Sequence, residues 1–384
     1  MTHPVSSNAK KIAKLALLKL ISRRVFPDGV TFRLLRVLGI DYEMRKEPVE
    51  KVFVSRFLGG CNGAFCISVD FDNRRDDRQE VDRAATLEIL SLCEEFNIPV
   101  TWAICGVTAV KEKNVFQRIL DSKIKHEIAI HTFDHIDFSS PECTEELAKS
   151  QILRTISLLP PGAGRETFIF PWNREEHFNI LNELGFIAYR GRDRKLAYPS
   201  KNNGLWNIHP LFYLSEKNYT YSSVLKALLD LAISKEAVFH LWFHPWNLEK
   251  NGNASRYVKD TLRPLLEYAD FKRRKGKLWI CTLGDIANYC EARSKAKISF
   301  KEKGRSMDIS VECRVEDTRF RKNQVLTLGI RIFKNVGKTT VFLDGSSIPA
   351  EELVFKKQDR RTGVLYLNLL FDKHFKNLHL DFEL

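Results

Sequence analysis

Residues 126–135 read HEIAIHTFDH, and this stretch decides the expected fold. The apolar run at 128–130 between polar ends is typical of a short buried strand. His131 and His135 follow at spacing i, i+4, which places both imidazoles on one side of a helix or helix-like loop. Two neutral imidazoles can hold a divalent metal once an acidic oxygen joins them. Taken alone, the pair also fits two ordinary polar residues of a surface loop.

The chain around this stretch alternates strand-like and helix-like patterns. Strands are expected at 64–70, 100–104, 127–130, 167–170, 186–189, 237–243 and 278–282, and helices at 81–96, 107–120, 145–159, 175–184, 221–233, 255–271 and 284–292. Repeated strand–helix pairs predict a parallel sheet that is buried on both faces, either open or closed into a barrel. In such folds ligands bind at the carboxyl ends of the strands.

Carboxylates and histidines recur at these strand ends. Asp70 and Asp72 follow the first strand, His131 and His135 the third, and His244 the strand at 237–243. One carboxylate with two imidazoles leaves open positions on a zinc-like ion, as catalytic sites require. A second carboxylate can take a proton from water, and a separate histidine can protonate a leaving group. Together the residues predict metal-assisted hydrolysis of an amide or ester. Taken singly, the aspartates also fit helix caps and the late histidine fits a turn.

These motifs resemble those of the NodB-like polysaccharide deacetylases, metal-dependent enzymes that remove N- or O-acetyl groups from glycans. Residues 67–73 resemble the first motif of the family, 131–135 the second, and 241–244 the late Leu-x-x-His motif. The resemblance extends over residues 60–290 and implies a distorted (β/α) barrel with fewer than eight regular strands.

The resemblance also implies a role for each residue of the site. Asp70 is the expected general base and His244 the expected general acid. Asp72, His131 and His135 are the expected ligands of one divalent metal. Zinc is the first expectation for that metal, with cobalt, manganese or nickel as alternatives.

The chain departs from the family at the third motif. The family usually has Arg-x-Pro-Tyr there, with the arginine steadying the base, whereas residues 169–172 read Ile-Phe-Pro-Trp. Arg174 and Arg190 are the candidates to replace the missing arginine. The supporting acidic residue of the fourth motif is also not evident, and Asp193 is the candidate for it.

The substrate side of the site is expected around the third motif. Trp172 takes the tyrosine position, where a main-chain N–H stabilises the oxyanion, and a change of side chain leaves that donor intact. The expected oxyanion and substrate residues are Trp172, Asn173, Arg174 and Trp246. The aromatic rings among them can stack on sugar rings or pack in the core.

Composition narrows the class of partner. The net charge of +13 suits an anionic partner. No nucleic acid is expected, because the basic residues are dispersed and no recognised motif accompanies them. Residues 8–24, within a basic leader at 1–50, fit an amphipathic helix on an anionic membrane or a helix packed on the main domain. Lysines interrupt the apolar residues of the leader too often for a membrane-spanning helix.

The cysteines and the leader bear on location. The eight cysteines show no CxxC pair and no regular spacing, so reduced, buried thiols are expected. No export signal is recognised in the leader. A cytoplasmic protein is therefore expected, peripheral on the inner membrane face and acting on an acetylated sugar, a glycan or a lipid-linked precursor.

Residues 296–384 change to a period-two alternation. Strands are expected at 307–311, 325–333, 364–371 and 378–384, with a hairpin turn at Asp344-Gly345 and a basic linker at 293–303. The expected organisation is a leader at 1–50, a deacetylase-like barrel at 51–295 and a β-rich accessory domain at 296–384.

Two functions remain open from the sequence. The first is a metal-dependent carbohydrate deacetylase that removes an acetyl group from a sugar or glycan precursor. The alternative is a catalytically inactive glycan-binding or scaffold protein at a membrane glycan-assembly site. The missing third-motif arginine and the extra β domain motivate the alternative.

Overall fold

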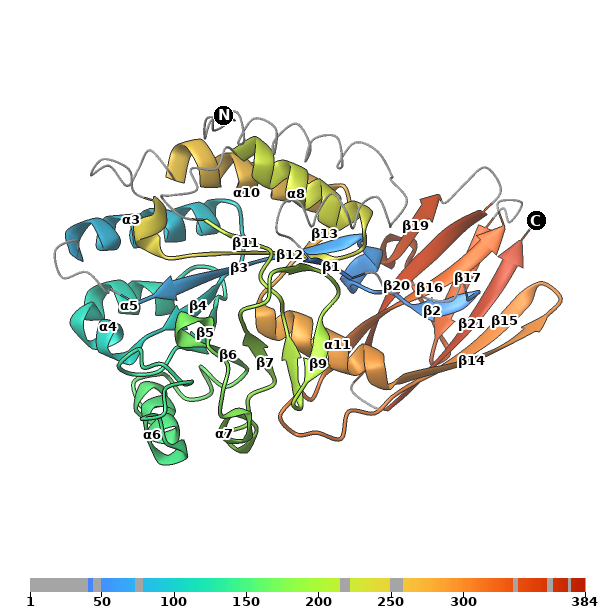
Figure 1. The fold of residues 1–384 in the computed structure, drawn as a ribbon. Helices are drawn as coiled ribbons and strands as arrows, with labels where there is room; N and C mark the ends of the chain where they lie inside the picture. The colour runs from blue at the N-terminus through green and yellow to red at the C-terminus, as the bar shows by residue number, and fades with distance from the viewer. Residues whose placement is uncertain are drawn as a thin grey trace, which may run out of the picture. The chain divides into compact units, whose positions relative to one another are not determined.

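A computed structural model describes residues 41–43, 50–72, 79–214, 222–248, 258–333, 338–357, 362–371 and 374–383 (Figure 1). The chain divides into two compact units, Met1–Arg45 with Gly63–Ile286, and Lys46–Asn62 with Ala287–Leu384. Each unit is described by itself. Apart from residues 41–43 and 50, the predicted leader lies outside the described residues, and so does its predicted membrane-contact segment at 8–24.

The first unit is built on one curled, mainly parallel sheet. Its strands run in the order β11-β12-β3-β4-β5-β6-β7-β10-β9, and β13 also pairs with β3. The bounds are β3 (Gly63–Phe71), β4 (Thr101–Ile104), β5 (Glu127–Ile130), β6 (Thr167–Ile169), β7 (Ala188–Arg190), β9 (Ser200–Asn202), β10 (Leu205–Asn207), β11 (Phe212–Tyr213), β12 (Val238–Phe243) and β13 (Leu278–Ile280). This is the predicted distorted barrel, and its predicted parallel strands are confirmed.

Strand β3 is the centre of the sheet because it pairs on both edges. It pairs in parallel with β12 over its first residues and with β4 over its last, and β13 pairs with its beginning. All nine residues of GAFCISVDF are buried, as expected for a strand covered on both faces. Gly63 begins the strand because a Cβ there would approach the Ile233 backbone to 3.1 Å.

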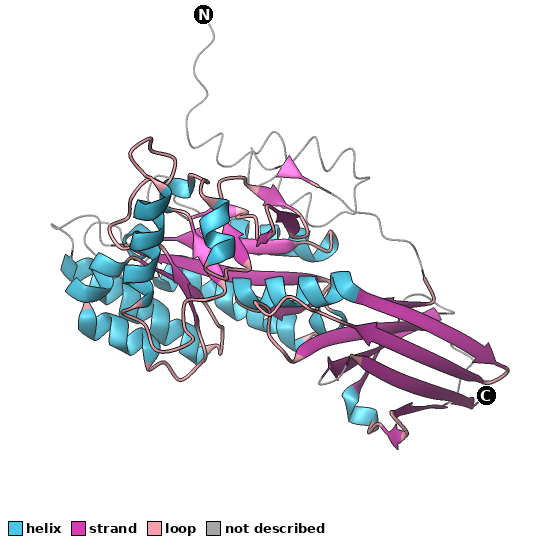
Figure 2. Cartoon of the chain, turned by 90° about the horizontal axis from the view of Figure 1, so that it is seen from below, coloured by secondary structure: helices cyan, strands magenta, loops and turns pink. Residues whose placement is uncertain are grey.

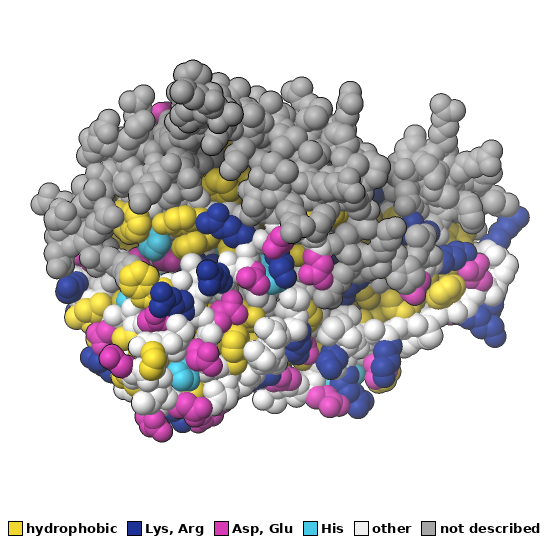
Figure 3. All heavy atoms as spheres, viewed as in Figure 1, with side chains coloured by type: hydrophobic (Ala, Val, Ile, Leu, Met, Phe, Trp, Pro, Cys, Tyr) yellow, Lys and Arg dark blue, Asp and Glu magenta, His cyan; other side chains and the backbone are white. Residues whose placement is uncertain are grey.

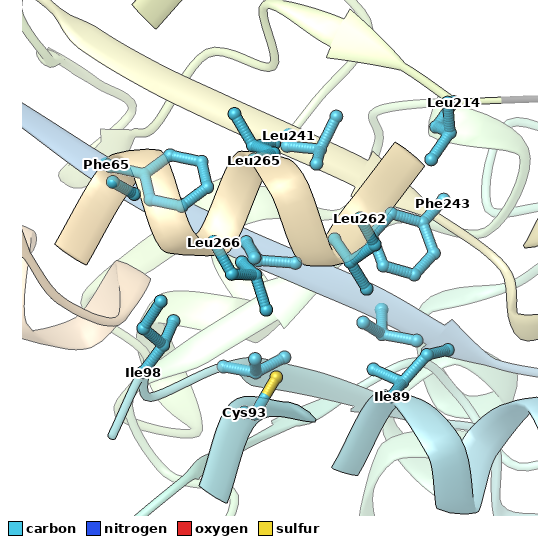
Figure 4. Close-up of a cluster of buried hydrophobic side chains, with 14 of the residues drawn as sticks. Phe65, Ile89, Cys93, Ile98, Leu214, Leu241, Phe243, Leu262, Leu265 and Leu266 are labelled. Atoms are coloured by element: carbon cyan, nitrogen blue, oxygen red, sulfur yellow. The ribbon is translucent and has the colours of Figure 1, made fainter. Parts of the chain in front are cut away.

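Helices cover the sheet (Figure 1). Their bounds are α3 (Gln79–Glu95), α4 (Gly106–Lys111), α5 (Lys113–Leu120), α6 (Glu145–Ile156), α7 (Phe178–Glu183), α8 (Ser222–Ser234) and α10 (Arg263–Arg274). Helix α11 (Leu283–Lys295) begins in this unit and continues into the second. Apolar residues of α3 and α10 meet those of β3 and β12 in one cluster, which includes Ile89, Leu266, Phe65 and Leu241 (Figure 4). Each such side chain contributes roughly 1.5–3 kcal/mol relative to exposure.

Two parts of the first unit differ from the predicted elements. The single helix expected at 107–120 is two helices, α4 and α5, that break at Glu112. The Glu112 side chain is buried and forms an ion pair with Arg83 of α3. The apolar spacing continues through the break, so periodicity does not show it. The strands between residues 195 and 213 are only two or three residues long, too short to leave a period in the sequence.

The second unit consists of two antiparallel sheets (Figure 2). One has the order β14-β15-β21-β17-β18 and the other β19-β20-β16-β2. The bounds are β2 (Val52–Val54), β14 (Ala296–Lys303), β15 (Ser306–Cys313), β16 (Gln324–Phe333), β17 (Lys338–Leu343), β18 (Ser346–Ser347), β19 (Leu353–Lys357), β20 (Thr362–Phe371) and β21 (Phe375–Glu383). The predicted antiparallel β domain is confirmed.

Two expected boundaries need correction. The predicted basic linker at 293–303 is the end of α11 followed by strand β14, which pairs along its whole length with β15. The charged residues of β14 gave the impression of a linker because β14 is an edge strand and most of its residues are exposed. Residues 51–62 were expected in the barrel, but β2 pairs with β16 of the second unit.

Local chemistry explains the predicted hairpin turn. Strands β17 and β18 pair at Leu343 and Ser346, so Asp344-Gly345 is a two-residue loop. Both loop residues have positive φ, 49° and 86°. This is the conformation that Asp-Gly favours between antiparallel strands, and the predicted turn is confirmed.

Other expectations concern the chain as a whole. Each of the eight cysteines is free, and all except Cys61 are buried. Among the helices that the structure describes, none has the length and apolar character needed to cross a bilayer. Figure 3 shows basic and acidic side chains interleaved on the visible described surface.

A buried carboxyl lies at the amino end of β5. Glu127 accepts hydrogen bonds from Thr101 at 2.7 Å, Thr167 at 2.5 Å and the Gly284 N–H at 3.0 Å. A Cβ on Gly284 would lie 2.8 Å from Oε1 of this buried, hydrogen-bonded carboxyl, so glycine favours the close approach. Burial and the neighbouring Glu166 carboxylate raise the pKa of Glu127 to about 7.

Glu127→Gln should remove a pH dependence of folding stability. In the folded protein Glu127 keeps its proton up to a pH of about 7, whereas the ordinary pKa is 4.5. Its stabilising contribution is therefore complete below pH 4.5 and is lost as the pH rises through 7, by about 3 kcal/mol. Denaturant unfolding at several pH values should show that, as the pH rises from 4.5 to 7, the free energy of unfolding of the variant increases relative to that of wild type. Glu142→Gln, at an exposed position, is the control, and equal slopes for wild type and Glu127→Gln would contradict the prediction.

Candidate active site

The predicted site residues meet at the carboxyl ends of adjacent strands. Asp70 is the last residue but one of β3, and Asp72 follows that strand. His131 directly follows β5, and its N–H donates to the Ile104 carbonyl of β4 at 3.0 Å. His244 directly follows β12. Because parallel strands point their ends the same way, residues distant in the sequence converge here.

Asp72, His131 and His135 form a compact cluster. One ligand atom from each lies within 4.8 Å of the others. His135 Nε2 is 3.1 Å from Asp72 Oδ2, and the two imidazole rings are 4.8 Å apart between centroids. Among the described residues this is the one group of three or more His, Cys, Asp or Glu with metal-binding geometry.

The cluster fits a metal ion because several of its buried ligand atoms accept no hydrogen bond from the described residues. These atoms are both carboxylate oxygens of Asp72 and Nε2 of His131. The Nδ1–H of His131 donates to the Ile169 carbonyl at 2.7 Å, which leaves the Nε2 lone pair directed at the cluster. Unpartnered buried polar atoms are costly unless a ligand satisfies them.

The charge state also suits a cation. Burial lowers the pKa of His131 to about 4, so the imidazole is neutral at neutral pH. Burial by itself raises the pKa of Asp72, but the neighbouring His244 and His135 outweigh that effect and lower it well below the ordinary range. The carboxylate is therefore ionised, as a metal ligand must be.

Asp70 is held by an arginine. Arg190, at the end of β7, donates from Nη1 to Asp70 Oδ1 at 2.6 Å and from Nη2 to Oδ2 at 2.7 Å. Burial opposes ionisation of Asp70, but the Arg190 charge and its hydrogen bonds outweigh it and lower the pKa. Arg174, the other candidate, forms an exposed ion pair with Asp137 instead.

His244 is held by neutral partners. Its Nδ1–H donates to Asn247 Oδ1 at 3.1 Å, with Tyr213 Oη at 3.4 Å, and its backbone N–H donates to the same Asn247 oxygen at 2.8 Å. Nε2 then faces the carboxylates, 3.6 Å from Asp72 and 3.7 Å from Asp70. Burial opposes the imidazolium, but these carboxylates outweigh it and raise the pKa of His244.

The structure gives the supporting place beside His244 to Asn247 and not to Asp193. The Asp193 candidate was wrong, because the hydrogen-bond partners of His244 Nδ1 are Asn247 and Tyr213. Asn247 lies in the short turn of Pro245–Leu248, three residues after the histidine that it supports. A search limited to acidic residues overlooks it, since an amide oxygen accepts the same Nδ1–H bond.

The remaining predicted residues lie around the cluster. The Trp172 ring is 52% exposed and lies 5.5 Å from the His135 ring. Trp246 stacks on His244, with ring centroids 4.5 Å apart. The side-chain oxygen of Asn173 is buried without a hydrogen-bond partner in the described structure. The exposed edge of the site is thus aromatic.

The loops of the site contain strained backbone. Thr132, His135, Trp172 and Asn173 all have positive φ, between 55° and 60°. Positive φ costs energy for residues with a side chain, least for asparagine and most for bulky or β-branched types. Such strain concentrates where function fixes the position of side chains.

A second buried group was not predicted. Ser68 and His240 hydrogen-bond each other at 2.8 Å. A period of two could have indicated them, because Ser68 and Asp70 share one face of β3, and His240 lies on β12 four residues before His244.

The curled α/β sheet with an Asp-His-His cluster at its strand ends defines a class of protein, an α/β fold with a candidate mononuclear metal centre. Residues 59–170 match the family profile described as polysaccharide deacetylase. This confirms the resemblance found in the motifs over that part of the chain. The match includes the metal cluster and Asp70, while Arg190 and His244 lie beyond it.

Solved structures show similarity at low identity. A putative polysaccharide deacetylase from Mycobacterium smegmatis is 17% identical, with 64% of this chain and 94% of that chain covered and a TM-score of 0.49. A probable polysaccharide deacetylase from Pseudomonas aeruginosa PAO1 is 13% identical, with 61% and 92% covered and a TM-score of 0.47. Puue allantoinase is 17% identical, with 63% and 93% covered and a TM-score of 0.47. The comparison with curated proteins gives no match.

The cluster predicts that zinc stabilises the protein through three named ligands. Zinc at 100 times its dissociation constant should add about 2.7 kcal/mol of stability and raise Tm. His131→Ala and Asp72→Asn should abolish this gain and the bound metal measured by elemental analysis. His379→Ala is the matched control, because His379 also pairs with aspartates but belongs to no metal-binding group in the described structure. A zinc-dependent rise in Tm that survives both site variants would contradict the assignment.

Proposed function

We propose that this protein is a metal-dependent hydrolase that removes an acetyl group from an N-acetylated or O-acetylated sugar or glycan precursor. One observation carries the proposal. His244 Nε2 lies 3.6 Å from Asp72 of the metal cluster and 3.7 Å from Asp70, a buried carboxylate outside the cluster. The cluster, Asp70 and His244 are thus suited to supply the metal centre, the base and the acid of metal-assisted hydrolysis of an acetamide or acetate ester.

Asp72, His131 and His135 are the residues that would hold the ion. A divalent cation there would polarise the acetyl carbonyl and make a water molecule acidic near neutral pH. The three protein ligands leave positions open for substrate and water, which distinguishes a catalytic from a structural site. Zinc is our proposal for the ion, on the basis of the mixed nitrogen and oxygen ligands.

Asp70 takes the proton of the attacking water. It is ionised, because Arg190 stabilises the carboxylate, and it is not among the three metal ligands. As the water oxygen bonds to the acetyl carbon, its proton passes to an oxygen of Asp70. The Arg190 fork holds that carboxylate in one plane, so the accepting lone pairs keep a fixed direction.

His244 supplies a proton to the leaving group. Its Nδ1–H is engaged by Asn247, so the proton available to substrate is on Nε2, which faces the two aspartates. The carbon–nitrogen or carbon–oxygen bond breaks as that proton moves to the sugar nitrogen or oxygen. The products are acetate and the free amine or hydroxyl.

The aromatic edge supports a sugar substrate. The exposed Trp172 ring and the Trp246 ring beside His244 offer apolar faces on which a pyranose can lie. We further propose a lipid-linked or nucleotide-linked precursor in the cytoplasm, at the inner membrane face. The basis is the basic amphipathic pattern at residues 8–24, and liposome flotation of the full chain with and without those residues tests it.

Activity should depend on the metal, the base and the acid in distinguishable ways. Chelation should abolish acetate release from acetylated sugars, and added zinc should restore it. Asp70→Asn and His244→Ala should each lower kcat by about 10²–10⁴-fold while metal content stays stoichiometric. Acetate release and elemental analysis on the same samples provide the measurement. A folded, metal-loaded wild type that binds glycan but hydrolyses none of a broad panel of acetylated sugars would favour the scaffold alternative.

Asn247→Leu should impair the acid without touching the metal. The substitution removes the acceptor for the His244 Nδ1–H while keeping a similar volume. We expect kcat to fall about tenfold with KM and metal content unchanged. Asn247→Asp, which restores an acceptor, should recover most of the loss. Full activity of Asn247→Leu would show that the hydrogen bond does not orient the histidine.

A further inference from the structure

We infer that Arg190 is the positioning residue for the base Asp70, and that it performs from β7 the task that Ile169 on β6 cannot perform. The inference rests on the proposed function, because it assigns a role within that reaction. With Arg190 in this role, the absence of an arginine at position 169 does not leave Asp70 unsupported.

The register of the sheet explains how the substitution is made. Ile169 and Arg190 are directly opposed partners in the parallel pairing of β6 and β7. Ile169 is fully buried and offers no donor to Asp70. Opposed residues on neighbouring strands lie at the same level of a sheet. The side chain of Arg190 therefore starts at the same level of the sheet as a side chain at position 169.

The contact fixes orientation as well as charge. Two parallel bonds of 2.6 and 2.7 Å join the guanidinium to both oxygens of Asp70. The side chains of Arg190 and Asp70 are only 1% and 3% exposed, so water does not compete for the fork. A planar fork sets the plane of the carboxylate, which a lysine ammonium, as a point charge, does not.

Arg190 is itself held from below by a directional chain of hydrogen bonds. Its Nη1 donates to Ser68 Oγ at 3.0 Å, and Ser68 lies 2.8 Å from His240 Nε2. The Nδ1 of His240 lies 3.0 Å from the Ile208 carbonyl, which can only accept, so Nδ1 carries the proton. Nε2 must then accept from the Ser68 hydroxyl, which leaves the Ser68 oxygen free to accept from Arg190.

An aromatic ring completes the support. The guanidinium carbon of Arg190 lies 4.3 Å from the centroid of the Trp242 ring. A cation over the face of a tryptophan is attracted by the ring. None of the groups that hold Arg190 belongs to the metal cluster. Loss of Arg190 should therefore disturb the base and spare the metal.

The first test separates orientation from charge and from metal binding. Arg190→Met should lower kcat about 100-fold and Arg190→Lys about tenfold, with KM within about twofold of wild type and stoichiometric metal in both. Arg192→Met, which removes the same charge from an exposed position two residues away, should match wild type. If Arg190→Met does not fold, Arg190→Lys decides, because it keeps the buried charge. Wild-type kcat in Arg190→Lys, or a loss of kcat that parallels loss of metal, would overturn the inference.

The second test transposes the arginine. Arg190→Ile combined with Ile169→Arg should recover at least about tenfold of the kcat that Arg190→Ile alone loses. A crystal structure of the double variant should show the introduced guanidinium forked on Asp70. Two results would overturn the inference. One is a guanidinium that binds both oxygens of Asp70 in the double variant without recovery of kcat, and the other is recovery of kcat although the guanidinium does not contact Asp70. Failure of the proposed function is distinct, since wild type itself would then release no acetate.

Discussion

Two buried aspartates separated by one residue, Asp70 and Asp72, impose the constraint that the surrounding structure satisfies. An ionised carboxylate in a protein interior costs several kcal/mol unless partners compensate. Asp70 is compensated by a forked guanidinium, with Ser68 and Trp242 holding the arginine in turn. Among the described residues, Asp72 pairs with the imidazoles of His135 and His244, and neither of its oxygens accepts a hydrogen bond. The end of β3 thus carries one carboxylate whose charge is balanced by an arginine, and it is followed by one whose charge a bound cation would balance.

This difference separates the roles of the two aspartates. A carboxylate locked by arginine cannot turn toward a metal, but it keeps its lone pairs in one direction, which suits a proton acceptor. A carboxylate with unused oxygens between two imidazoles suits a ligand. Positive φ at His135 and Trp172 indicates that the loops are strained while they bring their rings to this point. The rigid sheet beneath supports that strain.

The supporting groups depart from the family motifs, whereas Asp70 and His244 match them. An isoleucine stands at the arginine position and an asparagine beside His244, yet Asp70 and His244 each have a partner of suitable chemistry. What a supporting residue must provide is a donor or acceptor at a point in space. Any strand or turn whose register reaches that point can supply it, as β7 does for Asp70 and the Pro245–Leu248 turn does for His244.

Several features could be predicted from sequence patterns alone: the alternating strands and helices, the antiparallel second unit, the two-residue turn at Asp344-Gly345, and the grouping of Asp70, Asp72, His131, His135 and His244. These follow from local periods and from the rule that parallel strands end together. The break at Glu112, the strand in place of the linker at 296–303 and the pairing of β2 with β16 did not follow, because each depends on a contact distant in the sequence.

The arginine that reaches Asp70 could be identified only from the folded chain. Arg174 and Arg190 were equal candidates, and Arg190 lies 120 residues from Asp70 along the chain. The choice is made by the register that opposes Arg190 to Ile169 and by the burial that leaves the guanidinium one carboxylate to pair with. The local sequence pattern indicates which face of a strand a side chain occupies. Which residues on two strands can hydrogen-bond to each other depends on the register in which the strands pair.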